Sequence, residues 1–296
     1  MILKTLSIQS IDDQMGDFEY LFDLLEIIKD NNYNATLDFS DCNFLRQNAF
    51  AVLGGIIRLA EENKGKIEIL WKTFNTNLLN NLLKNGFLFT FSKFKFDYKP
   101  SVENSIPYRE DKTKKPNDIL KYLHQHWLGK GWINISPRLK DEISGKVWEL
   151  YDNAFTHSGS PIGVISCGEH YPQNKTLKLT IVDFGISIPN GVRKFKNNQN
   201  LASDKIMLWA FQRGSSTKSE EIGRGLGLDL FKQFIKINRG HLEVFSLDGY
   251  ASITKEEDRF TTYNKPFGGT LVNITFNCNE SYYCLSSEKK STQFTF

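Results

Sequence analysis

The sequence has few of the features that mark secreted, membrane or metal-binding proteins. Of its 296 residues only four are cysteines, and no two of them form a CxxC pair. This usage is typical of a reducing compartment and fits neither a disulfide framework nor a zinc module. The residues before Asp12 contain no apolar core of signal-peptide length. No run approaches the roughly 20 apolar residues that span a bilayer, so we expect a cytoplasmic protein that does not enter a membrane.

The chain also lacks a strong charge of either sign. Its 37 Lys and Arg and 34 Asp and Glu leave a net charge of +3, and the two signs are interspersed. There is therefore no global basic field, and nucleic acid is not indicated as a partner. Hydrophobic residues make up 40% of the chain, including 23 Phe, 11 Tyr and 5 Trp. This composition excludes a disordered, collagenous or coiled-coil protein, and the length corresponds to about two domains.

Residues 1–98 are predicted to form a small α/β domain. Apolar periodicity predicts helices over 17–29, 48–64 and 77–85. Short apolar segments predict strands over 35–39 and 66–71, and Gly86 is expected to cap the third helix. Such alternation indicates a sheet with helices packed against it.

Residues 99–116 contain three prolines and many charges, so we expect a linker there. The second domain is then 117–296. It is predicted to contain helices over 118–128, 136–156, 203–213 and 225–238, and strands over 162–167, 177–183, 242–246 and 270–277. Between the second of these strands and residue 202 we expect a long irregular stretch.

Two polar patterns accompany these predicted elements. On the helix 136–156, Glu149, Asn153 and His157 are spaced by four and share one face. A carboxylate and a carboxamide one turn apart can hold a water and a Mg²⁺, because hard cations take oxygen ligands, although an ordinary solvated helix face gives the same spacing. Asp183, at the end of a strand, can accept from an exocyclic amine, and Gly185 lets a flat ring approach the backbone. An Asx turn is the alternative for this second pattern.

Two glycine-rich segments follow. The segment GRGLGL (223–228) opens a predicted helix, where unpaired N–H groups and the helix dipole favour a phosphate. Just upstream, Thr217 and Lys218 offer a hydroxyl and a cation, as in a lid that closes over phosphates; a flexible surface loop is the alternative. The segment GGT (268–270) precedes the last strand, where a hairpin turn explains it equally well. No P-loop pattern occurs, and GRGLGL does not directly follow a strand as a dinucleotide-binding turn would.

Taken together, the segments ELYDNAFTH (149–157), VDFGISI (182–188), GRGLGL and GGT resemble the motifs of the GHKL ATPase family, which includes gyrase B, heat-shock chaperone ATPases and histidine kinases. Their order and separation agree with that family over about residues 136–278. The resemblance implies that 117–296 form a two-layer α/β sandwich that binds ATP and Mg²⁺.

The resemblance also implies a role for each matching residue. Glu149 would polarise the attacking water, Asn153 would coordinate Mg²⁺, and Asp183 would bind the adenine amino group. The other nucleotide-binding residues that it implies are Gly185, Ser187, Thr217, Lys218, Gly223, Gly225, Leu226, Gly227, Leu228 and Thr270. Ser187 departs from the family, which has glycine there. Because serine disfavours positive φ, we expect the hinge of the lid, predicted over about 191–223, to sit differently.

Residues 35–65 resemble the STAS domain of anti-sigma-factor antagonists in their strand–loop–helix order. The loop reads Arg46-Gln47-Asn48-Ala49, so the phosphorylatable serine that is usual there is absent. An unrelated small α/β domain is the alternative.

Three functions are compatible with these patterns. The favoured one is a Mg²⁺-dependent ATPase that uses closure of the lid to drive a conformational or assembly change, because the Glu149/Asn153 pair is intact. The alternatives are an anti-sigma-type serine kinase acting on a partner protein, and a non-enzymatic scaffold that nucleotide stabilises. A protein partner is expected and a homodimer stays open. The sequence does not distinguish stress signalling, a mobile element and antiviral defence.

Overall fold

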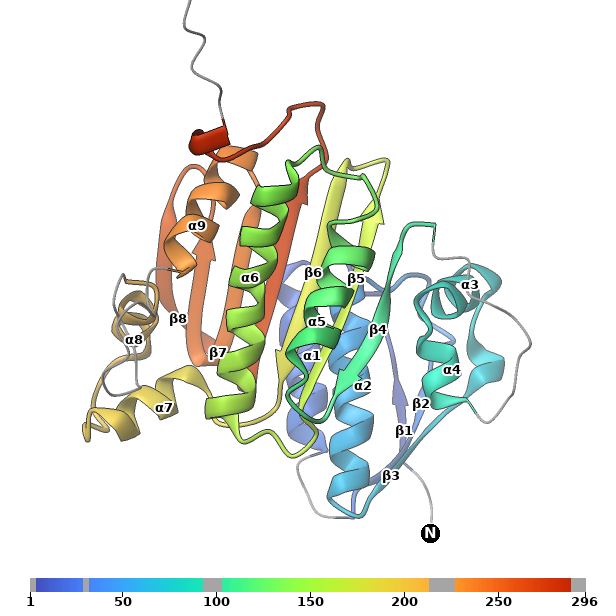
Figure 1. Cartoon of the computed structure of the whole chain (residues 1–296). Coiled ribbons are helices and arrows are strands. Elements are labelled where there is room, and N and C mark those ends of the chain that lie inside the picture. The colour runs from blue at the N-terminus through green and yellow to red at the C-terminus, as the bar shows by residue number, and fades with distance from the viewer. Residues whose placement is uncertain (1–3, 29–31, 93–102, 213–226, 289–296) are drawn as a thin grey trace, which may run out of the picture.

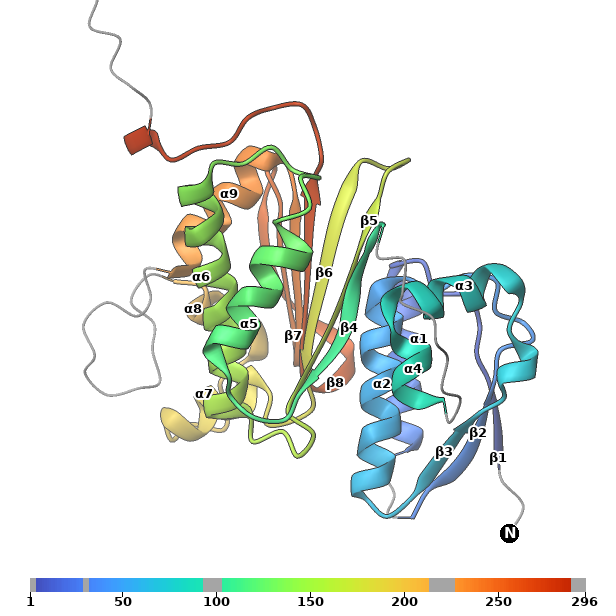
Figure 2. The same cartoon turned by 45° about the vertical axis from the view of Figure 1, so that its right-hand side comes forward.

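The chain folds into four stacked layers, as Figures 1 and 2 show. This computed structural model describes residues 4–28, 32–92, 103–212 and 227–288. From one side to the other the layers are a group of helices, a five-stranded sheet, the helices α1 and α2, and a three-stranded sheet. Within the described parts of the chain, every helix is too short or too polar to cross a membrane.

The N-terminal unit, residues 4–92, contains the small sheet. Its three strands are parallel in the order β1-β2-β3. The strands are β1 (Lys4–Ser7), β2 (Asn34–Asp38) and β3 (Lys66–Ile69), and the helices are α1 (Met15–Ile27), α2 (Gln47–Glu62), η1 (Trp71–Thr73), α3 (Thr76–Asn85) and α4 (Phe87–Phe91). Gly86 ends α3 in the left-handed region with φ 83°, which confirms the predicted cap.

The rest of the described chain forms an antiparallel sheet with the order β4-β5-β6-β8-β7. Its strands are β4 (Ser105–Asp111), β5 (Val164–Tyr171), β6 (Thr176–Asp183), β7 (His241–Ile253) and β8 (Asp258–Asn277). The helices are α5 (Pro116–Tyr122), η2 (Leu123–Trp127), α6 (Pro137–Asn153), η3 (Ala154–Ser158), α7 (Ile188–Phe195), α8 (Ser203–Ala210), α9 (Gly227–Asn238) and η4 (Ser286–Glu288). This architecture confirms the predicted α/β fold class, with helices packed on a sheet.

Part of the segment expected to be a linker is the edge strand β4. A break in register between Ile106 and Arg109 accommodates Pro107, which cannot donate to the ladder. The charges on this strand are paired, since Arg109 binds Asp111 within the strand and Glu110 accepts from Arg58 of α2 at 2.9 Å. A polar, proline-containing strand therefore pairs with β5 where the sequence predicts a linker. The division at 1–98 and 117–296 remains a prediction.

A single hydrophobic core joins the two units. Helix α2 packs against β5 and β6, and α1 packs against β8. The ring of Phe18 lies 4.7 Å from that of Phe245, and the ring of Phe22 lies 4.9 Å from that of Phe267. The five-stranded sheet is thus covered on both faces, by α5, α6 and α9 on one side and by α1 and α2 on the other.

This shared core predicts that the two units unfold together. We expect Phe22→Ala to lower the free energy of unfolding by about 3–5 kcal/mol, the usual cost of deleting a buried phenylalanine ring. Tryptophan fluorescence and far-UV circular dichroism should follow one coincident urea transition, shifted as a whole. Ile27→Ala is the control, because that side chain on the same helix is 37% exposed. A separate early step that left the remaining transition in place would contradict the shared core.

Candidate nucleotide-binding site

Three polar side chains form a row that starts at the end of β6 and crosses the neighbouring strands β8 and β7. Asp183 of β6 is the cross-strand neighbour of Thr270 of β8, which in turn neighbours Ser246 of β7. Because side chains alternate along a strand, this row faces the side of α6 and α9, while the next row faces α1 and α2. That second row consists of Val182, Leu271 and Phe245.

Hydrogen bonds connect the row to the start of α7. The fully buried Ser246 hydroxyl donates to the carbonyl of Gly269 at 2.9 Å and lies 3.0 Å from Thr270 Oγ1. It also accepts from the backbone N–H of Ile188 at 2.8 Å. No sequence pattern indicated Ser246 as a site residue. Only the pairing of β7 with β8 brings it to the site, and a strand read by itself gives no signal of that register.

Asp183 is a buried carboxylate. Asp183 is only 4% exposed, and its Oδ1 accepts from the backbone N–H of Gly185 at 3.0 Å. Burial raises the pKa of Asp183 to about 7, although hydrogen bonds from Gly185 and from the Ser158 side chain oppose the shift. Among the described residues, no lysine, arginine or histidine forms an ion pair with it. A buried anion of this kind is suited to an uncharged N–H donor on a ligand.

Gly185 is required by the backbone beside it. A Cβ at this position would lie 2.1 Å from the carbonyl oxygen of Ser158, which also accepts from the N–H of Ile186 at 2.5 Å. The glycine therefore allows the π-helical turn η3 to pack closely against the loop after β6.

Ser187 stands at the start of a helix that the sequence analysis did not predict. Its φ is −64°, and its hydroxyl accepts from the N–H of Asn190 at 3.3 Å as the N-cap of α7. The prediction of an irregular stretch is therefore wrong over Ile188–Phe195, which form α7. Serine at the position where the resemblance implies a glycine therefore has a local reason, because serine caps a helix better than most residues.

Glu149 and Asn153 lie in the last turns of α6, and both side chains reach the solvent. The Glu149 side chain is 43% exposed and pairs with Lys146 at 2.9 Å, and Asn153 is exposed at the last residue of the helix. The α-helix ends there and η3 follows, so His157 is not one α-helical turn beyond Asn153 as expected. The turn η3 nevertheless continues α6 to Ser158, whose carbonyl accepts from the Ile186 N–H in the loop that carries Gly185.

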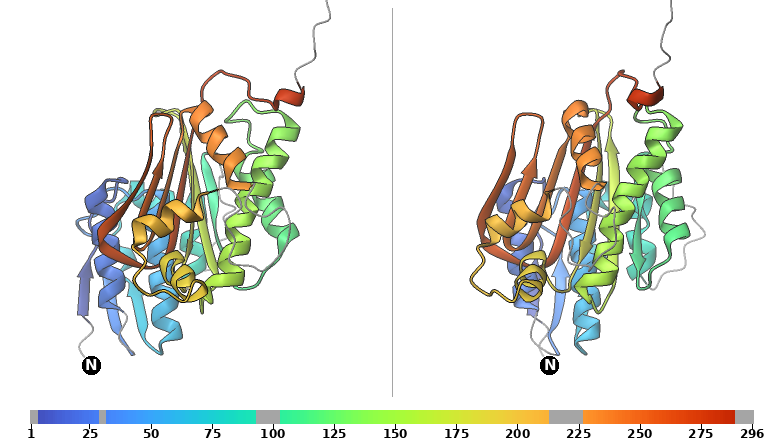
Figure 3. Two further views of the ribbon diagram at one scale, coloured as in Figure 1. Left: turned by 90° about the vertical axis from the view of Figure 1, so that its left-hand side faces the viewer. Right: turned by 60° about the vertical axis from the view of Figure 1, so that its left-hand side comes forward.

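The first half of the predicted lid contains the helices α7 and α8, joined by residues 196–202. Helices α7 and α8 lie against β7, as Figure 3 shows. Arg193 joins them, since its guanidinium donates to the Leu201 carbonyl and to the Ser203 hydroxyl, both at 2.9 Å. The Ser203 hydroxyl in turn donates to Asp248 of β7 at 2.5 Å. This network anchors both helices to the sheet.

The predicted phosphate-binding residues can be placed only in part. Thr217, Lys218, Gly223, Gly225 and Leu226 lie outside the described residues. Gly227 and Leu228 form the beginning of α9. This helix is held to the β7–β8 hairpin by Asp258, which accepts from Lys232 at 2.9 Å and from Lys236 at 2.8 Å.

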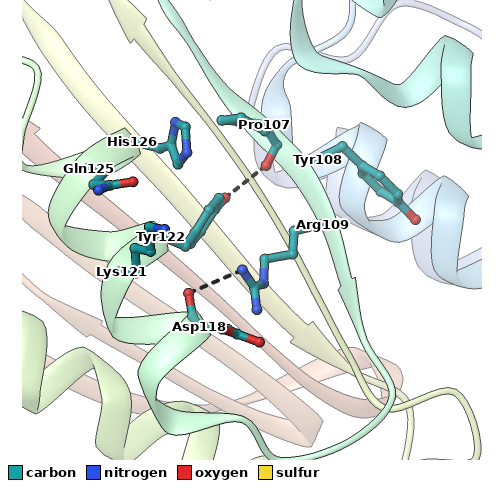
Figure 4. A pocket seen from close by; sticks show the side chains of 8 residues that line it. All are labelled: Pro107, Tyr108, Arg109, Asp118, Lys121, Tyr122, Gln125 and His126. Atoms are coloured by element: carbon teal, nitrogen blue, oxygen red, sulfur yellow. Dashed lines mark hydrogen bonds between the residues drawn. The ribbon is translucent and has the colours of Figure 1, made fainter.

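A hollow of about 350 Å³ lies between β4 and the helices α5 and η2 (Figure 4). It is separate from the row of Asp183 and contains no predicted site residue. Two of its polar side chains are already bonded within the protein, because Tyr122 donates to the Pro107 carbonyl at 2.9 Å and Arg109 donates to the Asp118 carbonyl at 3.2 Å. We assign it no ligand.

The protein oxygens near the site could hold Mg²⁺ only together with oxygens of a bound substrate. In the ranges that the structure describes, no three His, Cys, Asp or Glu side chains gather as a metal site built from protein alone would require. The exposed carboxamide oxygen of Asn153 is a hard donor, and Mg²⁺ is usually held by one or two protein oxygens together with substrate phosphates and water.

The raised pKa of Asp183 predicts a pH-dependent stability. The folded-state pKa of about 7 exceeds the usual value of 3.8, so the folded protein binds this proton more tightly than the unfolded chain. The contribution of Asp183 to stability therefore falls as the pH rises from about 4 to about 7 and stays low above that. Asp183→Asn should melt several degrees above the parent at pH 8, without nucleotide, and close to it at pH 4. Glu142→Gln, which neutralises an exposed carboxylate, is the control, and a gain that did not depend on pH would contradict the burial of a charge.

Comparison with known proteins supports the GHKL resemblance for this part of the chain. Residues 141–280 match the family described as histidine kinase-, DNA gyrase B-, and HSP90-like ATPase. No curated protein matches the chain. The match does not reach the N-terminal unit, so the STAS resemblance is not confirmed. Residues 141–280 are thus similar to the ATP-binding domain of a family that includes both ATPases and kinases.

Proposed function

We propose that this protein binds Mg-ATP at the row of Asp183, Thr270 and Ser246 and hydrolyses it. The observation that carries the proposal is the buried carboxylate of Asp183, which has no cationic partner among the described residues and lies within the matched family domain. A carboxylate in that position accepts from an exocyclic amino group, so adenine would be favoured over a base that presents a carbonyl oxygen there.

The hydroxyl network beside Asp183 would orient the base. Ser246 and Thr270 lie within hydrogen-bond distance of each other, and Ser246 is fixed by the Ile188 N–H and the Gly269 carbonyl. Side chains whose hydrogen bonds are already made do not need to reorganise when a ligand arrives, which favours binding.

Glu149 and Asn153 would provide the chemistry from α6. The carboxylate of Glu149 would act as the general base that orients and polarises the attacking water, after the side chain leaves its ion pair with Lys146. Asn153 would hold Mg²⁺ through its carboxamide oxygen. When bound, that ion would neutralise charge on the phosphates. Closure of residues 191–223, which begin in α7 and continue through α8, would couple turnover to a conformational or assembly change.

The central experiment uses ATP labelled in the γ-phosphate, with Mg²⁺. Free labelled phosphate would support hydrolysis. Label transferred to a serine on an added protein would instead support the kinase alternative, and nucleotide binding without either product would support the scaffold.

Glu149→Ala separates binding from chemistry. We expect turnover to fall by roughly 10²-fold or more, the usual scale for the loss of a positioned general base, while ATP affinity stays within a few-fold. Glu142→Ala is the matched control, because it removes an exposed carboxylate from the same helix two turns earlier and should leave both quantities unchanged.

Asn153→Ala should behave differently from Glu149→Ala. It should weaken ATP binding in Mg²⁺ but have little effect on binding in EDTA, because only the metal-dependent part of the affinity passes through its carboxamide. If Glu149→Ala and Asn153→Ala both hydrolysed ATP like the parent, the proposed active site would be wrong.

A further inference from the structure

Two adjacent glycines of α2 each receive an aromatic ring from the second unit. A Cβ at Gly54 would lie 2.1 Å from the hydroxyl oxygen of Tyr108 on β4. A Cβ at Gly55 would lie 2.0 Å from Cε2 of Phe184. Real Cβ atoms essentially never make contacts shorter than 3.0 Å, so both rings are seated directly against the helix where a side chain would be. Only one of these two residues, Phe184, is a neighbour in the chain of a residue of the candidate nucleotide site.

Phe184 lies between Asp183 and Gly185 in the chain. Its side chain is buried in the core shared with α1 and α2, on the opposite side of the sheet from the Asp183 carboxylate. Its backbone N–H lies 3.4 Å from the Ser160 hydroxyl. With the ring fixed on one face, the backbone that carries Asp183 has little freedom to rotate on the other.

A second phenylalanine connects the other strand of the site to the same helices. The ring of Phe267, three residues before Thr270, lies 5.6 Å from the ring of Phe184 and 4.9 Å from that of Phe22 on α1. Gly269 is held closely too, since a Cβ there would lie 2.1 Å from the Asp183 carbonyl, and its φ of 132° is one that other residues rarely adopt.

We propose that Phe184, seated on Gly55 of α2, is a positioning residue through which the N-terminal unit sets the place of Asp183 and thereby the affinity and selectivity for adenine. This inference rests on the proposed function. It assigns to the N-terminal unit a direct part in base recognition, transmitted through one side-chain contact, and it makes the seating of α2 on the sheet a determinant of nucleotide affinity.

The paired glycines supply a matched test. Gly55→Ala and Gly54→Ala introduce the same methyl group at neighbouring positions, and we expect both to lower the melting temperature. Only Gly55→Ala should lower the affinity for ADP, by tenfold or more, and reduce the preference for ADP over GDP, as measured by calorimetric titration of the full chain. Gly54→Ala should bind ADP within about twofold of the parent, because Tyr108 lies on the edge strand and not at the site.

A compensating substitution distinguishes positioning from general destabilisation. Phe184→Leu shortens the side chain that meets the new methyl group, so Gly55→Ala/Phe184→Leu should recover most of the lost ADP affinity. Phe184→Leu combined with Gly54→Ala should produce no such recovery. Phe184→Leu alone should weaken ADP binding by several-fold, and Phe50→Leu, at a buried ring that contacts Phe87 within the N-terminal unit, should not. This pair keeps the test decisive if Gly55→Ala fails to fold.

The possible results separate the two claims. If the parent binds ADP and Gly55→Ala binds it equally well, or if the two glycine variants lose affinity to the same extent, the inference is wrong and the proposed function stands. If the parent binds neither ADP nor ATP, the proposed function is wrong and the inference fails with it.

Discussion

The alternation of side chains along β6, β8 and β7 is the constraint on which the rest of this structure depends. One row, Asp183–Thr270–Ser246, faces the helices of the matched domain, and the adjacent row faces α1 and α2. A slip of one residue in any of these strands would exchange a carboxylate or hydroxyl for an apolar side chain on both faces at once. A change in the register of these strands would therefore disrupt the polar site on one face and the shared core on the other.

The burial of Asp183 has a cost that the surrounding structure offsets. A carboxylate removed from water loses several kcal/mol of hydration, and among the described residues the Gly185 N–H and the Ser158 hydroxyl compensate it directly. The large core around the site tolerates this cost, because both faces of the sheet are covered and little of the strand interior is exposed. A buried ionisable group that destabilises the free protein is more typical of a binding position than of a purely structural one.

Sequence reasoning located the elements whose signals are local. The helical periodicity of α2 and α6, the glycine cap at Gly86 and the carboxylate at the end of β6 can each be identified from neighbouring residues. It failed where the signal was polar or non-local. The strand β4 contains Pro107 and paired charges, and the role of Ser246 depends on which strand lies beside β7. Helix α7 did have a local signal, because Ser187 is followed by Pro189 in the first turn. The prediction instead treated Ser187 as a replacement for a glycine and did not use this signal.

The sequence of α2 also indicates that a second surface covers this helix, although the signal can be mistaken for that of an ordinary buried helix. Twelve of the sixteen residues of α2 are buried, including the whole stretch from Gln47 to Ile57. A helix that is apolar all round must be covered on all sides, whereas a helix lying on a three-stranded sheet needs only one apolar stripe. The glycines of α2 indicate the same, because Gly54 and Gly55 lie where the rings of Tyr108 and Phe184 from the second unit approach the helix. The composition of α2 thus argues against a freely tethered N-terminal unit, because its central helix buries residues against the five-stranded sheet as well as against its own sheet.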